Sequence, residues 1–191
     1  MSRESDIQKW MLMWGFPKRH IKYERSDMIG VKPSIIDKVE KYSEEYPYSK
    51  GLYLFSKENS SGKTMLATYA VKQIMRQHRL KLGVYWYTTT LIEALRDNLD
   101  NRTELINLKE RIFKADLVVL DDLGKEITSM FAARMLNMII DELYREEKRV
   151  IITSNIELSE LQICRRSEDV ETNYTGSIVG RLSEMVDIIY I

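Results

Sequence analysis

The sequence is poor in the residues that build disulfides, metal centres and membrane spans. It has one cysteine, Cys164, and two histidines in 191 residues. A single cysteine cannot form an internal disulfide, and no histidine lies near it, so we interpret Cys164 as a structural thiol in a reducing cytosol. No run of about 18 apolar residues is present, and the N-terminus has no long apolar stretch. These absences predict a cytoplasmic protein with neither a membrane partner nor a signal peptide.

A net charge of one sign is also missing, because 29 lysines and arginines balance 29 acidic residues. Overall charge therefore indicates no particular partner. Locally, the first 32 residues carry seven basic against four acidic residues, and a second basic cluster comprises Lys72, Arg76, His78, Arg79 and Lys81. Such clusters contact nucleic acid in some proteins, although solvated surface is the commoner explanation.

From residue 51 onward, short apolar runs alternate with helical patterns. The runs are rich in Val, Ile, Leu and Tyr, which is typical of strands covered on both faces. The predicted strands are 52–55, 83–88, 117–120, 150–153 and 187–191, and the predicted helices are 63–79, 90–98, 104–113, 129–146 and 177–185. This alternation predicts a three-layer αβα domain with a five-stranded parallel sheet.

Two further helices are predicted before this core, at residues 4–14 and 33–46, with an irregular segment between them. We therefore divide the chain into a short N-terminal helix and extended segment, residues 1–32, and a core, residues 33–191. One face of the first helix carries Ile7, Trp10, Met11 and Trp14. Aromatic and Met side chains suit a protein interface, and they equally suit packing on the core. The sequence leaves both possibilities open.

The strand at 52–55 and the helix at 63–79 enclose the end of a phosphate-binding loop, Gly62-Lys63-Thr64. In such loops backbone N–H groups and the helix N-terminus surround phosphates, the lysine supplies positive charge, and the threonine hydroxyl binds Mg²⁺. The pattern G-x-x-x-x-G-K-[ST] also requires a glycine where this chain has Lys57. The predicted nucleotide-binding residues are Asn59, Ser60, Ser61, Gly62, Lys63, Thr64 and Met65.

Polar side chains follow two other predicted strands. Asp121 and Asp122 come directly after an apolar run, and Asn155 follows the strand at 150–153, with Thr153 and Ser154 beside it. We assign Asp121, with Thr64, to the metal, and Asp122 to the attacking water. Asn155 is a candidate contact for the γ-phosphate or that water. Acid pairs and Ser-Asn also form ordinary turns, but their occurrence downstream of Gly62-Lys63-Thr64 favours one site.

These elements, in this order, resemble the AAA+ ATPases of the DnaC/DnaI helicase-loader group, whose core the IstB transposition helpers share. The most specific segment is DLVVLDDLGKEITSMFAARMLNMIIDELYREEKRVIITSNIELSEL (116–161), and GFPKRH (15–20) is similar to the segment that precedes the family's core. The resemblance implies an AAA+ P-loop NTPase that binds ATP and Mg²⁺. It makes Lys63 and Thr64 Walker A residues, Asp121 and Asp122 Walker B residues, and Asn155 sensor 1.

By the same resemblance, Arg181 acts as an arginine finger in a neighbouring subunit's ATP site, with Arg165 and Arg166 as alternatives. The stretch 87–116 corresponds to the helical element that is implicated in assembly and single-stranded DNA contact in the loaders. We expect residues 91–113 and the basic stretch 76–81 to bind such DNA non-specifically and in a salt-sensitive manner.

The function implied is an ATP-dependent loader. Its subunits would assemble with ATP at their interfaces, engage a hexameric replicative helicase, and place it on single-stranded DNA, with slow, assembly-dependent ATP hydrolysis. Two alternatives stay open. One is an IstB-like ATPase helper of a transposase or recombinase that acts on duplex DNA. The other is a non-hydrolysing AAA+ interaction protein that binds the host helicase or loader.

The sequence departs from the family pattern in three places. The family loop reads approximately G-x-x-G-x-G-K-T, so Lys57 and Ser60 replace two glycines; a positive φ at Lys57 would cost about 1 kcal/mol, with Asn59 and the serines easing the turn. About 15 residues precede GFPKRH, where loaders usually have a helicase-gripping domain. The chain also stops after the fifth strand, without a helical lid, which suggests a phage or mobile-element version.

Overall fold

The computed structural model describes residues 3–124, 130–162 and 173–191. Cys164, Arg165 and Arg166 lie outside these ranges, and so does the first residue of the helix predicted at 129–146.

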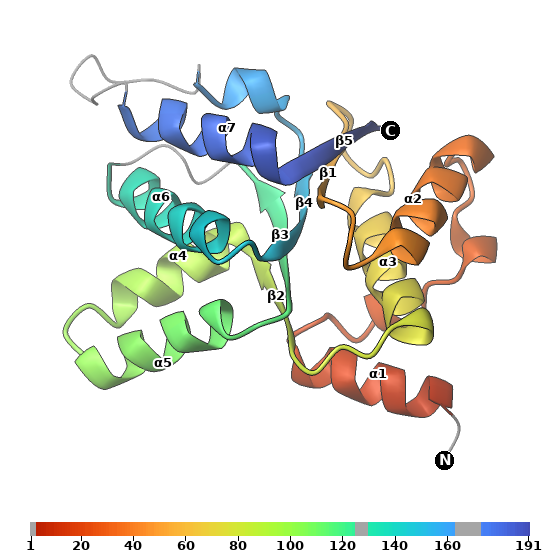
Figure 1. Cartoon of the computed structure of the whole chain (residues 1–191), viewed down its shortest axis with the longest axis horizontal. Helices are drawn as coiled ribbons and strands as arrows, with labels where there is room; N and C mark the ends of the chain where they lie inside the picture. The colour runs from red at the N-terminus through yellow and green to blue at the C-terminus, as the bar shows by residue number, and fades with distance from the viewer. Residues whose placement is uncertain (1–2, 125–129, 163–172) are drawn as a thin grey trace.

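Five parallel strands form a single sheet (Figure 1). They are β1 (Gly51–Phe55), β2 (Gly83–Tyr87), β3 (Leu117–Leu123), β4 (Arg149–Ser154) and β5 (Val186–Tyr190). The order across the sheet is β2-β3-β4-β1-β5. β4 lies between β1 and β3, so the carboxyl ends of these three strands meet at one edge, where α/β sheets bind ligands. The predicted five-stranded parallel sheet is confirmed.

In the described part of the chain, seven α-helices cover the two faces of this sheet. They are α1 (Arg3–Met13), α2 (Pro33–Glu45), α3 (Lys63–Gln77), α4 (Thr88–Asp97), α5 (Arg102–Phe113), α6 (Met130–Arg145) and α7 (Asn173–Met185). Figure 1 shows α1, α2 and α3 on one side and α4 to α7 on the other. The three-layer prediction is therefore confirmed, and the described ranges contain no helical lid. None of the described helices has the length and apolar character needed to cross a membrane.

Alternating strand residues supply the two cores, as the period of two in a β-strand requires. Val118, Leu120 and Ile152 pack with α4 to α7, while Leu117, Val119 and Ile151 pack with α1, α2 and α3. Full burial on both faces explains why these strands read as continuous apolar runs in the sequence.

The N-terminal helix packs on the core and also exposes part of its predicted apolar face. Met11 and Trp14 are buried in the core shared with α2 and α3, whereas Trp10 is 46% exposed. A Cβ atom at Gly83 would lie 2.5 Å from the Trp14 ring, so only glycine admits the indole there. The proposed boundary at residue 32 therefore separates elements that share one core.

The segment between α1 and α2, predicted to be irregular, contains two 3₁₀ turns, His20–Lys22 and Arg25–Asp27. Two residues of the basic cluster, Lys72 and Arg76, bind this segment to α3. The Lys72 side chain is fully buried, and its Nζ donates to the Tyr23 carbonyl at 2.6 Å and to Glu24 at 2.9 Å. Arg76 forms ion pairs with Glu4 and Glu24. The interpretation of Lys72 and Arg76 as solvated surface is wrong, because both stabilise the fold internally.

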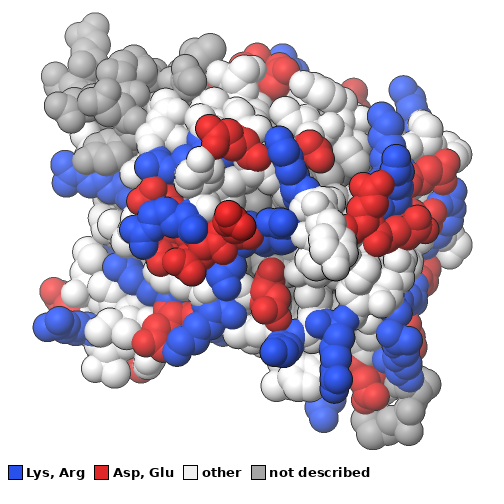
Figure 2. All heavy atoms as spheres, viewed as in Figure 1, with Lys and Arg blue, Asp and Glu red and all other residues white. Residues whose placement is uncertain are grey.

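The face of the molecule seen in Figure 2 carries charges of both signs. On the face that Figure 2 shows, lysine and arginine side chains alternate with aspartate and glutamate side chains. This distribution agrees with the balanced composition of the sequence.

Candidate functional site

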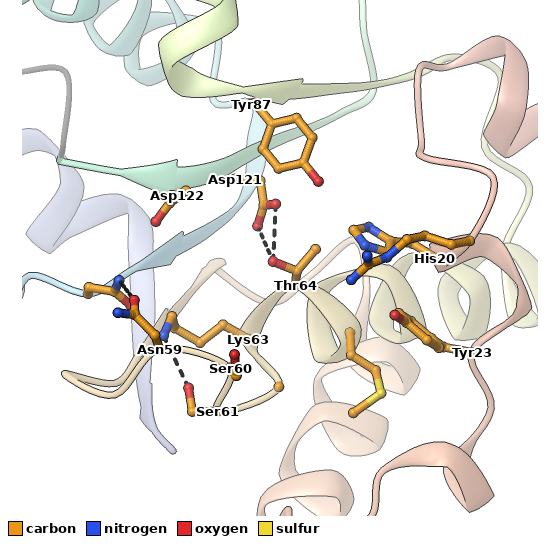
Figure 3. A pocket seen from close by; sticks show the side chains of 14 residues that line it. His20, Tyr23, Asn59, Ser60, Ser61, Lys63, Thr64, Tyr87, Asp121 and Asp122 are labelled. Carbon is orange, nitrogen blue, oxygen red and sulfur yellow. Dashed lines mark hydrogen bonds between the residues drawn. The ribbon is translucent and has the colours of Figure 1, made fainter.

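A cavity of about 470 Å³ opens where the carboxyl ends of β1, β3 and β4 meet (Figure 3). The structure brings ten sequence-predicted residues to its wall: Asn59, Ser60, Ser61, Gly62, Lys63, Thr64, Met65, Asp121, Asp122 and Asn155. The other lining residues are Arg19, His20, Tyr23 and Tyr87. Arg181 does not line this cavity. The volume falls in the range typical of small-molecule sites, about 300–1,000 Å³.

The loop after β1 surrounds the lysine side chain with oxygen atoms. The Lys63 Nζ donates to the carbonyls of Ser56 (3.2 Å) and Glu58 (2.8 Å) and to the Ser61 hydroxyl (3.1 Å). Gly62 has a φ of 89° immediately before α3 begins. The N-terminus of α3, with its partial positive charge, therefore faces the cavity beside an ammonium group.

The two non-glycine substitutions in this loop have different conformations. Ser60 has a φ of 59°, in the left-handed region that favours glycine, and Lys57 is not among the described residues with positive φ. Lys57 instead forms an exposed ion pair with Glu160 at 3.6 Å. The strain considered for Lys57 is therefore absent, and Ser60 is the non-glycine residue of the loop with left-handed backbone.

Hydroxyl groups surround the fully buried Asp121 carboxylate. Thr64 Oγ1 donates to its two oxygens at 2.9 and 3.1 Å, and Thr153 Oγ1 donates to Oδ1 at 2.6 Å. A third donor, the Tyr85 hydroxyl of β2, reaches Oδ2 at 2.6 Å. This role of Tyr85 cannot be identified from the sequence, because nothing in a strand's apolar run marks which side chain reaches across to a neighbouring strand.

A local irregularity in β3 separates the two aspartates. The pairing of β3 with β4 shifts register between Leu120 and Leu123, and Asp122 has a φ of 62°. The Asp122 N–H donates to Thr153 Oγ1 at 2.9 Å. As a result Asp121 points toward Thr64, while Asp122 lies apart from it at the cavity wall (Figure 3). Two adjacent carboxylates thus occupy different environments.

Asn155 links the end of β4 to the phosphate-binding loop. Its Nδ2 donates to the Asn59 Oδ1 at 2.8 Å. This contact joins two residues that the sequence predicted separately, one for the loop and one for sensor 1.

Arg181 lies on α7, at some remove from the cavity, and its guanidinium contacts α6. It forms an ion pair with Asp141 at 2.7 Å and donates hydrogen bonds to Asn137 and Ser177. The role predicted for it belongs to a neighbouring subunit's site. To act there, the guanidinium has to exchange these contacts for new ones.

One wall of the cavity consists of residues that the sequence motifs do not predict: Arg19, His20 and Tyr23. The rings of His20 and Tyr23 stack with centroids 5.4 Å apart, and Arg19 lines the cavity beside them. Burial lowers the pKa of His20 and Arg19 lowers it further, while Asp121 opposes the change. The imidazole is therefore neutral at pH 7. Arg19 and His20 lie in the segment GFPKRH, which indicated the family resemblance but not a contact with the cavity.

Residues 54–189 match a protein family described as IstB-like ATP binding protein. No curated protein sequence matches the chain. Among solved structures, the fold is similar to that of DnaI (TM-score 0.78, 23% identity, covering 93% of this chain and 95% of that one). It is also similar to the DnaC helicase loader (TM-score 0.71, 23% identity, 92% and 99%). These findings confirm the predicted resemblance to the DnaC/DnaI group with its IstB-like core.

A more distant likeness is to the replication initiator DnaA bound to AMPPCP and single-stranded DNA. The TM-score is 0.68 at 19% identity, and the alignment covers 89% of this chain but 50% of the other. At these identities the structural likenesses establish a shared α/β P-loop NTPase fold.

Proposed function

The chain belongs to the family of IstB-like ATP-binding proteins, and we propose that it is an ATP-dependent loader of a replicative DNA helicase. The observation that carries the nucleotide site is the meeting of Lys63, Thr64 and Asp121 at one edge of the sheet. The loader role is supported by the similarity of the fold to DnaI and to the DnaC helicase loader.

In this proposal the N-terminus of α3 and the Lys63 ammonium receive the β and γ phosphates of ATP. Lys63 exchanges its contacts with the Glu58 carbonyl and the Ser61 hydroxyl for phosphate oxygens. The stacked rings of His20 and Tyr23 form an aromatic wall that suits the nucleobase. The cavity therefore offers cationic and aromatic groups to the two chemically different parts of one nucleotide.

The oxygen donors in the cavity also fit Mg²⁺. Mg²⁺ in nucleotide sites keeps several waters and takes one or two protein ligands along with phosphate oxygens, so an all-protein cage is not expected. Within the described residues, no group of three or more His, Cys, Asp or Glu could hold a metal alone. Thr64 and Asp121 would hold the ion, which neutralises phosphate charge when bound.

For hydrolysis, we assign separate roles to three residues. Asp122 orients the attacking water and accepts its proton. Asn155, held by Asn59, contacts the water or the γ-phosphate. Arg181 of a neighbouring subunit stabilises transition-state charge, so that hydrolysis requires assembly. ATP binding between subunits would then serve as the assembly switch.

The partners proposed are a hexameric replicative helicase and single-stranded DNA. Arg76 is already paired with Glu4 and Glu24, so the stretch 76–81 is a weaker candidate for the DNA contact than its sequence indicated. Residues 91–113, in α4 and α5, remain the proposed DNA-binding region. Their contact with the phosphate backbone is expected to weaken steeply as salt concentration rises.

Two other functions have specific support. The family match favours an IstB-like helper of a transposase or recombinase. The non-glycine residues Lys57 and Ser60 favour a non-hydrolysing protein that binds the host helicase or loader. The mass of the complex with a helicase, with and without ATP, together with an assay for filaments on duplex DNA, separates the three. ATP-dependent helicase binding supports the loader, filaments on duplex DNA support the helper, and helicase binding without ATP binding selects the interaction protein.

The nucleotide site itself is tested by Lys63→Ala. Charge-assisted hydrogen bonds contribute about 1.5–3 kcal/mol each, so losing them lowers ATP affinity by about 100-fold or more. Calorimetric titration measures the effect, and Lys41→Ala is the matched control, because Lys41 is an exposed lysine of α2. Unchanged ATP affinity in Lys63→Ala would overturn the site assignment.

A further inference from the structure

The Asp121 carboxylate receives hydroxyl groups from three separate elements of the fold. Thr64 belongs to α3, Thr153 belongs to β4, and Tyr85 belongs to β2. The first two follow from motifs in the nucleotide site. Tyr85 does not, since it lies in the middle of the edge strand β2, and its hydroxyl reaches the carboxylate from this neighbouring strand.

The three hydroxyl groups differ in their other contacts and roles. Thr64 is the proposed metal ligand, so its oxygen turns toward the ion when one binds. Thr153 Oγ1 is shared, because it accepts from the Asp122 N–H while it donates to Asp121 Oδ1. The Tyr85 hydroxyl donates to Oδ2 at 2.6 Å. It is therefore the group that fixes Oδ2 once Thr64 has turned away.

The position of the Tyr85 phenol is determined by the segment that follows α1. Tyr85 is 4% exposed, and its N–H donates to the Trp14 carbonyl at 2.8 Å. Its ring lies 4.7 Å from the Phe16 ring, centroid to centroid, and Trp14 itself packs on Gly83 of the same strand. The backbone and the ring of Tyr85 are thus both held, and its hydroxyl donates to Asp121 Oδ2 from this position.

We propose that Tyr85 is a positioning residue for the metal site: its hydroxyl orients the Asp121 carboxylate toward the bound Mg²⁺–nucleotide. The inference rests on the proposed function, because it presupposes that Thr64 and Asp121 serve a metal. Mg²⁺ requires near-ideal octahedral geometry, and groups that orient a metal's ligands typically contribute a factor of about 10–100 to metal affinity.

The test is Tyr85→Phe, which removes the hydroxyl and keeps the ring against Phe16. ATP binding is measured by calorimetry in EDTA and then over a series of Mg²⁺ concentrations. We expect the ATP affinity in EDTA to stay within about 2-fold of wild type, and the Mg²⁺ concentration that gives half of the affinity gain to rise about 10-fold. A merely structural role would not separate these two quantities.

The matched control is Tyr46→Phe. Tyr46 is also buried, and its hydroxyl donates to the Asp116 carbonyl, away from the cavity. We expect both variants to lose thermal stability to a similar small extent in the absence of ligands, and Tyr46→Phe to keep the wild-type Mg²⁺ midpoint. A second measurement uses Asp121→Asn, in which adding Tyr85→Phe should raise the midpoint no further.

The outcomes distinguish a failure of the Tyr85 inference from a failure of the proposed nucleotide site. If wild type binds ATP with a Mg²⁺-dependent gain and Tyr85→Phe has the same midpoint, the Tyr85 inference is wrong and the nucleotide site stands. Additive effects of Tyr85→Phe and Asp121→Asn also overturn it. If the wild-type protein binds no ATP, the proposed function fails and the inference fails with it.

Discussion

The two ends of the cavity are built in different ways. At the phosphate end, Lys63, Asp121 and Asn155 follow β1, β3 and β4, and the sheet's order alone brings them together. At the other end, the wall formed by Arg19, His20 and Tyr23 comes from a segment with no regular strand. That wall depends on side-chain contacts between residues distant in the sequence, such as Lys72 with Tyr23 and Glu24.

One helix nevertheless connects the two ends. α3 begins with Lys63 at the phosphate end, and further along it carries Lys72 and Arg76, which hold the wall segment through Glu24. A substitution at the phosphate end should therefore change chemistry with little effect on folding. A substitution in the wall's support should change stability first and nucleotide affinity second.

The largest expected effect is that of Asp122→Asn at the phosphate end. Asn tolerates left-handed backbone as Asp does, so the φ of 62° is preserved while the carboxylate is lost. We expect ATP affinity close to wild type and a fall in assembly-dependent hydrolysis of about 10²–10⁴-fold, the usual contribution of a general base. Steady-state phosphate release at saturating ATP measures it.

The control for that substitution is Asp187→Asn, because Asp187 is exposed on β5. It should leave both binding and hydrolysis unchanged. If Asp122→Asn hydrolyses ATP at the wild-type rate, another group activates the water, and the assignment of separate roles to the two aspartates is wrong.

An intermediate effect is expected from Lys72→Met at the wall end. The Met side chain fills similar space but leaves the Tyr23 carbonyl without its donor, which costs about 1–3 kcal/mol of unfolding free energy. Glu24 keeps Arg76 and is 39% exposed, so the value belongs at the lower end. Displacement of the aromatic wall should also weaken ATP binding by about 5-fold, equivalent to one aromatic contact.

Chemical denaturation and calorimetry separate these two effects of Lys72→Met. Lys114→Met is the control, since Lys114 forms an exposed pair with Glu110 and should cost less than about 0.5 kcal/mol. A large loss of ATP affinity with unchanged stability would contradict the distinction between the two ends of the cavity.

The same difference explains how much of the molecule could be predicted from its sequence. Strands buried on both faces appear as apolar runs, and polar residues at their ends identify one edge of the sheet. The fold and the residues at the phosphate end could therefore be predicted from the sequence. The sequence placed Lys72 on the surface, because the acidic residue that pairs with it, Glu24, is distant in the sequence. Tyr85 looked like an ordinary core residue, because only strand order shows that its hydroxyl reaches Asp121.

The smallest effects come from restoring the family's two loop glycines one at a time. Ser60→Gly relieves a left-handed conformation that costs about 1–2 kcal/mol, and the added entropy of the unfolded chain offsets about 0.5–1 kcal/mol of this. Lys57→Gly relieves no backbone strain. It incurs only that entropic cost and loses the weak ion pair with Glu160. Denaturant titration should therefore show a small gain in stability for Ser60→Gly and a small loss for Lys57→Gly. Equal signs would mean that the loop differs from the conformation that places Ser60, and not Lys57, at positive φ.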